Sequence, residues 1–361
     1  METLSLFASG GISELYLHKV NKIKVVLANE LLKERCDFYS ECHNNEIIQG
    51  DICDSTIFNK IVKKSKKIEF IIATPPCQGM SKAGKMNYDD PRNILFIKVI
   101  ELSLILKPKY ILFENVPEFL KSNFLTKEKK SKSIMLEIRE SLGDLYNIEN
   151  SVLNAQDFEV PQNRKRAIVL LSRKDVPLWK IPMPISTKYI SVKDTIGHLV
   201  SLESGEKFID KVKNSKNVNM KNWHNALKHN DNHILWMKNT PSGKTAMDNK
   251  IFYPQKDGRK IKGFKTTYKR ISWENPAPTI TMSNGSISSQ NNVHPGKLLS
   301  DGTYSDARAL TVYELMLLSS IDEKFVIPKC ANEKLLRHLL GECVPPKFMY
   351  HLISSLPNSI S

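Results

Sequence analysis

Ile71-Ile72-Ala73-Thr74-Pro75-Pro76-Cys77-Gln78-Gly79 is the segment from which the architecture of the chain can be inferred. The apolar, β-branched run from Ile68 to Ala73 predicts a strand that is buried on both faces. Two prolines end that strand, because proline has no backbone N–H to donate to a sheet. Cys77 then lies beyond the carboxyl end of a strand, where ligands bind in open α/β sheets. A thiol there is placed to act as a nucleophile, although a lone cysteine is more often a packing residue.

Two further segments place reactive groups at strand ends. The segment Tyr110-Ile111-Leu112-Phe113-Glu114-Asn115-Val116-Pro117 predicts a second apolar strand, so Glu114 should lie at the same edge of the sheet as Cys77. Pro161-Gln162-Asn163-Arg164-Lys165-Arg166 leads into a strand over 167–171. Side chains at i and i+2 of an extended chain point the same way, so we expect both arginines to aim at one pocket.

These groups suit chemistry at C5 of a cytosine. Addition of a thiolate to C6 makes C5 nucleophilic toward a methyl donor, which is covalent catalysis. A neutral Glu114 can donate to N3, and a guanidinium can stabilise charge at O2. Nearby positive charge also lowers a thiol pKa from about 8.5 and increases the thiolate fraction at Cys77.

The ordered set Pro76-Cys77-Gln78, Glu114-Asn115-Val116 and Gln162-Asn163-Arg164-Lys165-Arg166 resembles the DNA (cytosine-5) methyltransferases of bacterial restriction–modification systems. The resemblance implies an α/β fold, with a Rossmann-like S-adenosylmethionine-dependent methyltransferase sheet, helices on both of its faces and a smaller loop-rich target-recognition domain. It implies methyl transfer to C5 of a flipped-out cytosine in a specific DNA sequence through a covalent Cys77–C6 adduct, with S-adenosyl-L-homocysteine as product. Glu114 would engage N3, Arg166 would hold O2, and Arg164 would orient Cys77 or a phosphate.

The same resemblance assigns a cofactor pocket. Glu30 would bind the ribose, and Asp51 would accept a hydrogen bond from the adenine amino group. Ile52 would form a wall of the pocket. The complete expected set is Phe7, Gly11, Glu30, Asp51, Ile52, Pro76, Leu95, Glu342 and Val344. The chain departs from the family pattern at Ser5 (usually acidic), Ser9 (glycine), Leu31 (aromatic) and Glu342 (asparagine). Taken alone, Asp51 could instead cap the helix that follows it.

Charge is concentrated in one third of the chain. The net charge is +15, and residues 175–304 contribute +10 of it, with 20 Lys/Arg and 10 Asp/Glu. We therefore predict a catalytic domain over 1–174 plus 305–361 and a DNA-reading domain over 175–304. The alternatives are a solvated lysine-rich face and an unstructured polar insertion. The expected DNA contacts are Gln78, Ser81, Lys82, Arg92, Arg270, Asn284, Ser286, Gln290 and Asn291.

The remaining sequence features concern localisation, oligomeric state, partners and metal binding. There is no apolar run of eighteen residues and no signal-like N-terminus, and the six cysteines form no C-x-x-C pair, so we expect a cytoplasmic monomer without a membrane span. Its partners would be double-stranded DNA and a cognate restriction endonuclease that forms no stable complex with it. His224, His229 and His233 could suggest a metal site, but we expect surface histidines and no metal.

Two rival functions stay open at this stage. One is an RNA (tRNA) cytosine-5 methyltransferase of the same fold, which a comparison of duplex DNA and tRNA as substrates would separate. The other is a catalytically silent DNA-binding regulator, against which the presence of Cys77, Glu114, Arg164 and Arg166 argues. For local structure we expect helices over 14–19, from Pro91 to Leu106 and over 127–141.

Overall fold

The structure is a computed structural model that describes residues 1–76, 94–126, 128–288 and 291–357. The chain forms two compact units. Unit 1 comprises Met1–Asn154, Lys165–Pro184 and Phe348–Ser361, and unit 2 comprises Ala155–Arg164 and Ile185–Lys347. Residues 155–164 and 305–347 thus group with the loop-rich segment. The division into catalytic and recognition domains stays a prediction about function.

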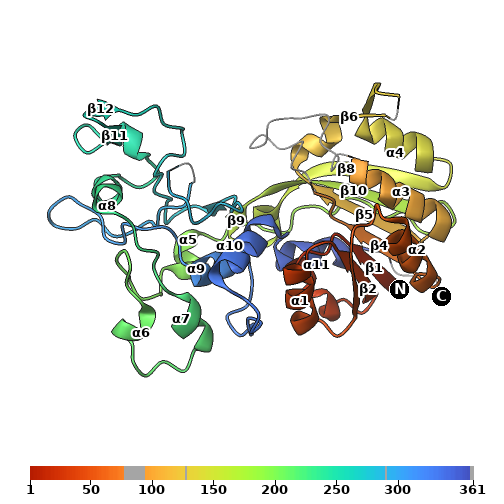
Figure 1. Cartoon of the computed structure of the whole chain (residues 1–361), viewed down its shortest axis with the longest axis horizontal. Helices are drawn as coiled ribbons and strands as arrows, with labels where there is room; N and C mark the ends of the chain where they lie inside the picture. The colour runs from red at the N-terminus through yellow and green to blue at the C-terminus, as the bar shows by residue number, and fades with distance from the viewer. Residues whose placement is uncertain (77–93, 127, 289–290, 358–361) are drawn as a thin grey trace. The chain divides into compact units, whose positions relative to one another are not determined.

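Unit 1 is built on a seven-stranded sheet with the order β3-β2-β1-β4-β5-β10-β8 (Figure 1). The first five strands are parallel, and β10 runs antiparallel to both of its neighbours. The strands are β1 (Glu2–Leu6), β2 (Lys24–Glu30), β3 (Glu46–Gln49), β4 (Phe70–Ala73), β5 (Tyr110–Asn115), β8 (Tyr146–Asn154) and β10 (Lys165–Arg173). The predicted α/β methyltransferase-type sheet is confirmed, since every strand expected from an apolar run is present.

Both faces of this sheet are buried, as parallel strands require. Alternate residues such as Leu6, Ala73 and Phe113 pack with α2 (Ser55–Lys64), α3 (Leu95–Leu106) and α4 (Ile134–Leu142) in one apolar core. On the other face Trp179 packs edge-on against Phe70 and Tyr110. Its indole N–H donates to the hydroxyl of Ser355, just beyond α11 (Pro346–Ser354). Each fully buried large apolar side chain contributes about 1.5–3 kcal/mol.

Two predicted helices differ from the observed elements. Residues 14–19 form two short 3-10 turns, η1 (Ile12–Glu14) and η2 (Leu17–Lys19), instead of a helix. The helix predicted over 127–141 begins later, because Ser133 caps it by accepting from the N–H of Leu136. Residues before it form a hairpin of β6 (Asn123–Leu125) and β7 (Ser131–Ser133). The helix predicted from Pro91 is described from Leu95 onward.

Unit 2 has short elements joined by long loops. Its helices are η5 (Ala155–Phe158), α5 (Val192–Ile196), α6 (Phe208–Lys211), α7 (Val218–Trp223), α8 (Asp231–Lys238), η6 (Ala246–Asp248), α9 (Val312–Leu318) and α10 (Glu333–Glu342). Its strands are β9 (Gln162–Asn163), β11 (Gln255–Lys256), β12 (Arg259–Lys260) and β13 (Ala277–Pro278). Unit 1 also holds α1 (Lys33–Cys42) and η4 (Pro117–Lys121). No helix among the described ranges is long and apolar enough to cross a bilayer.

A buried ionic cluster organises the centre of unit 2. The guanidinium of Arg308 donates to both carboxylate oxygens of Glu314 at 2.8 and 2.9 Å, and to Asp306 at 3.2 Å. Burial alone would raise the pKa of Glu314, but Arg308 and His294 beside it lower that pKa well below its ordinary value. Glu314 also closes the capping box of α9 with Thr311. The cluster therefore joins the start of α9 to the loop before it.

Arg308→Leu is expected to lower the free energy of unfolding by about 3–5 kcal/mol, because it leaves two buried carboxylates without their cation. Urea unfolding of the variant beside wild type measures this. Arg259→Leu removes an exposed arginine of the same unit and should change stability by no more than about 0.5 kcal/mol. A loss below about 1 kcal/mol for Arg308→Leu would contradict an energetic role for the cluster.

Candidate active site

The carboxyl ends of β1, β4 and β5 meet at one edge of the unit 1 sheet. Leu6 pairs with Ala73, and Ala73 pairs with Phe113, so Glu114 follows at the level of Thr74. The hydroxyl of Thr74 donates to the carbonyl of Phe7 at 3.1 Å. The side-chain amide of Asn115 donates to the carbonyl of Pro75 at 3.0 Å, which fixes the chain just before Cys77. Cys77 itself lies outside the described residues.

Glu114 and Arg166 form an ion pair at this edge. The Nε of Arg166 lies 2.9 Å from Oε1 of Glu114, and both side chains are nearly buried. The pair follows from the sheet register, in which β10 runs antiparallel to β5 with Ile168 opposite Glu114. Arg166 also donates to the carbonyl of Lys165 at 2.7 Å. A carboxyl and a guanidinium are therefore held together beside the segment that leads to Cys77.

Arg164 has different partners from Arg166. It is 1% exposed, and its guanidinium donates to the carbonyls of Ile280 (2.7 Å), Gly341 (2.9 Å) and Glu342 (3.2 Å) in unit 2. The printed partners of Arg164 thus differ from those of Arg166, and the expectation that both arginines aim at one pocket stays a prediction. Arg164 joins the end of α10, which carries the expected cofactor residue Glu342, to the chain around Ile280.

The same end of α10 requires a glycine. A Cβ added at Gly341 would lie 2.3 Å from the backbone nitrogen of Met282 and from the carbonyl carbon of Thr281. Backbone atoms cannot move aside as a side chain can, so only glycine permits this close approach. Val344, two residues beyond α10, is buried. Glu342 and Val344, both expected to contact the cofactor, are thus held in a tightly fixed segment of unit 2.

The turn after β1 has an unusual backbone. Phe7, Ser9 and Gly11 all adopt left-handed conformations, with φ of 59°, 51° and 71°. Ser9 thus takes the conformation that the usual glycine would adopt without steric cost, so this departure preserves the turn. The main-chain N–H of Ser9 donates to Glu30 at 2.9 Å. A Cβ on Gly11 would come within 2.4 Å of the ring of His43, so glycine is needed there.

Sequence reasoning missed a buried carboxyl beneath this turn. Glu14 accepts from the hydroxyls of Ser5 at 2.5 Å and Tyr39 at 2.7 Å. Burial raises the pKa of Glu14 to about 7, against the lowering effect of these two hydrogen bonds. The Tyr39 ring also packs at a tilt against His43, whose ring contacts the carbonyl of Gly11 at 3.0 Å. Glu14 therefore places a carboxyl beside Ser5, the position at which the family usually has an acidic residue. The missing acid at position 5 is the signal that could have pointed to Glu14.

Glu14→Gln is expected to remove a pH dependence of stability. A carboxyl whose pKa is raised on folding favours the protonated folded state, so stability falls as pH rises from about 4.5 through about 7. The full effect is about 3 kcal/mol. Urea unfolding at pH 5 and pH 8 should show the glutamine variant gaining stability relative to wild type at the higher pH. Glu34→Gln, at an exposed position of α1, should show no such gain, and an equal pH response of Glu14→Gln and wild type would refute the effect.

The other expected cofactor residues lie after β2, β3 and β4 or at the start of α3. Glu30 is buried at the end of β2 and accepts from the N–H groups of Ser9 and Leu32. Asp51 is exposed and accepts from the N–H of Cys53, whereas Asp54 caps α2, so the capping alternative for Asp51 is wrong. The others are Ile52, which is buried, Pro76, which is half-buried, and Leu95, the first residue of α3.

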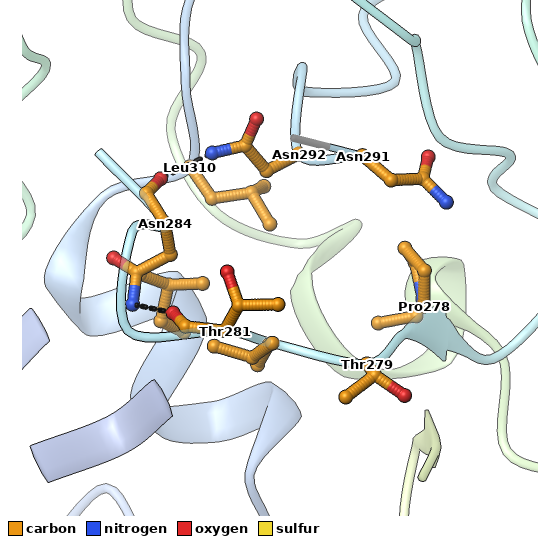
Figure 2. Close-up of a pocket in the computed structure, with 10 residues that line it drawn as sticks. Pro278, Thr279, Thr281, Asn284, Asn291, Asn292 and Leu310 are labelled. Atoms are coloured by element: carbon orange, nitrogen blue, oxygen red, sulfur yellow. Dashed lines mark hydrogen bonds between the residues drawn. The ribbon is translucent and has the colours of Figure 1, made fainter. Parts of the chain in front are cut away.

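Two expected DNA contacts are corrected. Arg270 is buried and donates to the carbonyls of Met237, Thr240 and His294, so its guanidinium serves the backbone of unit 2. Asn284 is also buried and bonded to the carbonyl of Thr281, which Figure 2 shows, and to Arg337. Neither side chain is available to a duplex.

The remaining expected DNA contacts have mixed positions. Ser286 is exposed, with its hydroxyl 3.4 Å from that of Ser288. Asn291 lines a small pocket of unit 2 beside Pro278 and Thr279 (Figure 2). Gln78, Ser81, Lys82, Arg92 and Gln290 lie outside the described residues.

Comparison with known proteins identifies the family. The model of the C-5 cytosine-specific DNA methylases matches residues 1–358. The Type II methyltransferase M1.HgaI of Avibacterium volantium is 43% identical over 365 residues, which cover 98% of each chain. M1.HphI of Haemophilus parahaemolyticus is 31% identical over 89% of this chain and 77% of its own.

Solved structures agree on the fold. A prophage-encoded DNA modification methyltransferase of E. coli superposes with a TM-score of 0.67 at 18% identity, covering 98% of both chains. The S. pombe Dnmt2 methyltransferase gives 0.62 at 15% identity, covering 98% of this chain and 97% of its own. Together with the ordered strand-end motifs, the matches show that the chain belongs to the C-5 cytosine-specific DNA methylase family and is a DNA (cytosine-5) methyltransferase.

Proposed function

We propose that the chain transfers a methyl group from S-adenosylmethionine to C5 of a cytosine that has left the duplex stack, through a covalent bond from Cys77 to C6. The observation that carries the proposal is the buried pair of Glu114 and Arg166, 2.9 Å apart at the sheet edge that leads to Cys77. Extrusion of the base costs a few kcal/mol, which binding to DNA must supply.

The proposed reaction uses groups of this chain at each stage. The Cys77 thiolate adds to C6, and the electron pair of the C5–C6 double bond becomes available at C5. Glu114 engages N3 and Arg166 holds O2, where negative charge accumulates. S-adenosylmethionine, when bound, supplies the methyl group that C5 acquires. A base, for which water is a candidate, then removes the C5 proton, and the double bond re-forms as the Cys77 thiolate leaves.

The residues around the β1 turn fit the cofactor chemically. Left-handed backbone at the alternate positions Phe7, Ser9 and Gly11 shapes the turn after β1, and Glu30 lies at the end of β2, where acidic side chains suit ribose hydroxyls. The exposed Asp51 can accept from an amino group, and Ile52 and Leu95 offer apolar walls. Phe7, Gly11, Pro76, Glu342 and Val344 complete the proposed set.

We place the activity in a Type II restriction–modification setting, because the relatives are Type II methyltransferases. The substrate is then duplex DNA with a specific sequence, methylated by a cytoplasmic monomer alongside a cognate endonuclease. In this proposal residues 1–174 and 305–361 carry catalysis, and residues 175–304 choose the sequence.

Bisulfite mapping of DNA from cells that express the protein tests the activity and reads out the target. Protected cytosines should occur at one position of one short sequence and should be lost with a Cys77→Ser variant. Absence of protected cytosines with wild-type protein, when the purified protein also fails to methylate DNA that contains every short sequence, would refute the proposed function. Transfer to tRNA but not to duplex DNA would replace it with the RNA alternative.

A further inference from the structure

We propose that residues 250–265, built around the β11–β12 hairpin, form a DNA-contacting surface in which Lys256 and Arg259 bind phosphates and Phe264 makes an apolar contact with the bases or sugars. The inference deepens the proposed function, on which it rests, by naming the part of unit 2 that holds the duplex. Figure 1 shows β11 and β12 side by side within that unit.

The hairpin has a defined tip. Gln255 pairs with Lys260 and Lys256 pairs with Arg259, which leaves Asp257 and Gly258 as a two-residue turn. Both turn residues have positive φ, 52° and 75°, the conformation of a type I′ hairpin turn. The tip is therefore held in register, and the side chains of Lys256 and Arg259 are presented together.

The charges on this hairpin are uncompensated. Residues 250–265 contain six Lys/Arg and one acidic residue, Asp257. All six cations are exposed, and none of them forms an ion pair with a carboxylate in the part of the chain that the structure describes. They are Lys250, Lys256, Arg259, Lys260, Lys262 and Lys265.

The cross-strand pair of cations favours the binding of an anion. Like charges directly opposite one another on neighbouring strands destabilise a hairpin, yet Lys256 faces Arg259. A phosphate between the two side chains would replace this repulsion with two attractions. Lys260 differs, since its ammonium donates to the carbonyl of Met247 at 2.7 Å and lies over the Tyr253 ring. Lys256 and Arg259 are therefore the cations best placed for a polyanion.

Exposed apolar side chains accompany these cations. Phe264 is 70% exposed between Lys262 and Lys265, and Ile251 is 74% exposed beside Lys250. Apolar side chains interleaved with cations match a DNA surface, in which phosphates flank sugars and thymine methyl groups. Duplex DNA is also the substrate class of the family, so the occupant of this surface is DNA.

The test measures binding of a fluorescein-labelled mixed-sequence duplex by anisotropy over a range of salt concentrations. Each phosphate contact contributes about −0.9 to the slope of log affinity against log salt, so Lys256→Gln/Arg259→Gln should reduce the steepness by about 1.8. Phe264→Ala should weaken binding about tenfold without changing the slope, because it removes apolar contact area but no charge. The matched control is Lys213→Gln/Lys216→Gln, which removes two exposed lysines from the loop between α6 and α7.

The control should keep the wild-type slope. An unchanged slope in Lys256→Gln/Arg259→Gln, or an equal change in the control, would overturn the hairpin proposal, and so would an unchanged affinity of Phe264→Ala. Melting temperatures equal to wild type confirm that each variant is folded, as expected for exposed positions. Wild-type protein that binds DNA but transfers no methyl group would instead refute the proposed function, so the two failures are distinguishable.

Discussion

Replacing Cys77 with serine should abolish methyl transfer, with a loss of about 10⁴-fold or more, while DNA affinity stays largely unchanged. A serine hydroxyl is a far weaker nucleophile than a thiolate, and no described group is placed to activate it in the same way. Removal of a covalent nucleophile typically costs activity on this scale. Transfer of labelled methyl from S-adenosylmethionine to duplex DNA measures turnover, and anisotropy measures affinity.

Cys330→Ser is the matched control, because Cys330 is an exposed cysteine of unit 2. It should retain full activity, which separates the loss at position 77 from any general effect of removing a thiol. Substantial turnover by Cys77→Ser would remove the covalent mechanism. Loss of DNA binding together with turnover would point instead to a structural role for the thiol.

Glu114→Gln should lower kcat by about 10²–10⁴-fold, with a smaller effect on DNA affinity. The amide has almost the same size as the carboxyl, so it fits the buried site, but it cannot transfer a proton at N3. It also leaves the Arg166 guanidinium without its 2.9 Å ion-pair partner. Single-turnover methyl transfer at saturating DNA separates the chemical step from binding and product release.

Glu149→Gln provides the comparison for this prediction. Glu149 lies on β8, where it pairs with Leu170 of β10, so the variant also changes a half-buried carboxylate of the sheet. Its kcat should match that of wild type. A Glu114→Gln enzyme with wild-type single-turnover rate would exclude proton donation by this residue and leave Arg166 as the main support for the ring.

The sheet was predictable because its signal is physical and local. Strands buried on both faces must be apolar throughout. The polar residue that ends such a strand must therefore lie at the edge of the sheet where the carboxyl ends of the strands meet. The ends of β4 and β5 follow directly from this rule. The edge position of Glu114 follows as well, because consecutive parallel strands carry their carboxyl ends together.

The separate partners of Arg164 and Arg166 were not predictable from spacing. The i, i+2 rule holds only within one continuous strand. Here β9 ends at Asn163 and pairs with β13, whereas β10 begins at Lys165 and pairs with β5 and β8. Arg164 lies at the junction between these two ladders, and β13, with which β9 pairs, is far away in sequence.

The wrong predictions that Arg270 and Asn284 contact DNA have a common cause. Polar residues in a loop-rich segment suggested contact with DNA, but a unit with short helices and strands leaves many main-chain carbonyls outside regular ladders. Buried carbonyls need donors, and arginine supplies five. Sequence alone does not tell which arginines of such a unit serve its own backbone and which face a partner.

The buried arginines of unit 2 have a consequence for how specificity can change. Arg164, Arg270, Arg308 and Arg337 each join segments that are distant in the chain through hydrogen bonds to carbonyls or carboxylates. Loops held at their bases by such anchors can vary in length and composition between them without loss of the framework. Exchange of the loop tips between relatives, with these four arginines retained, is therefore a practical route to enzymes that methylate new sequences.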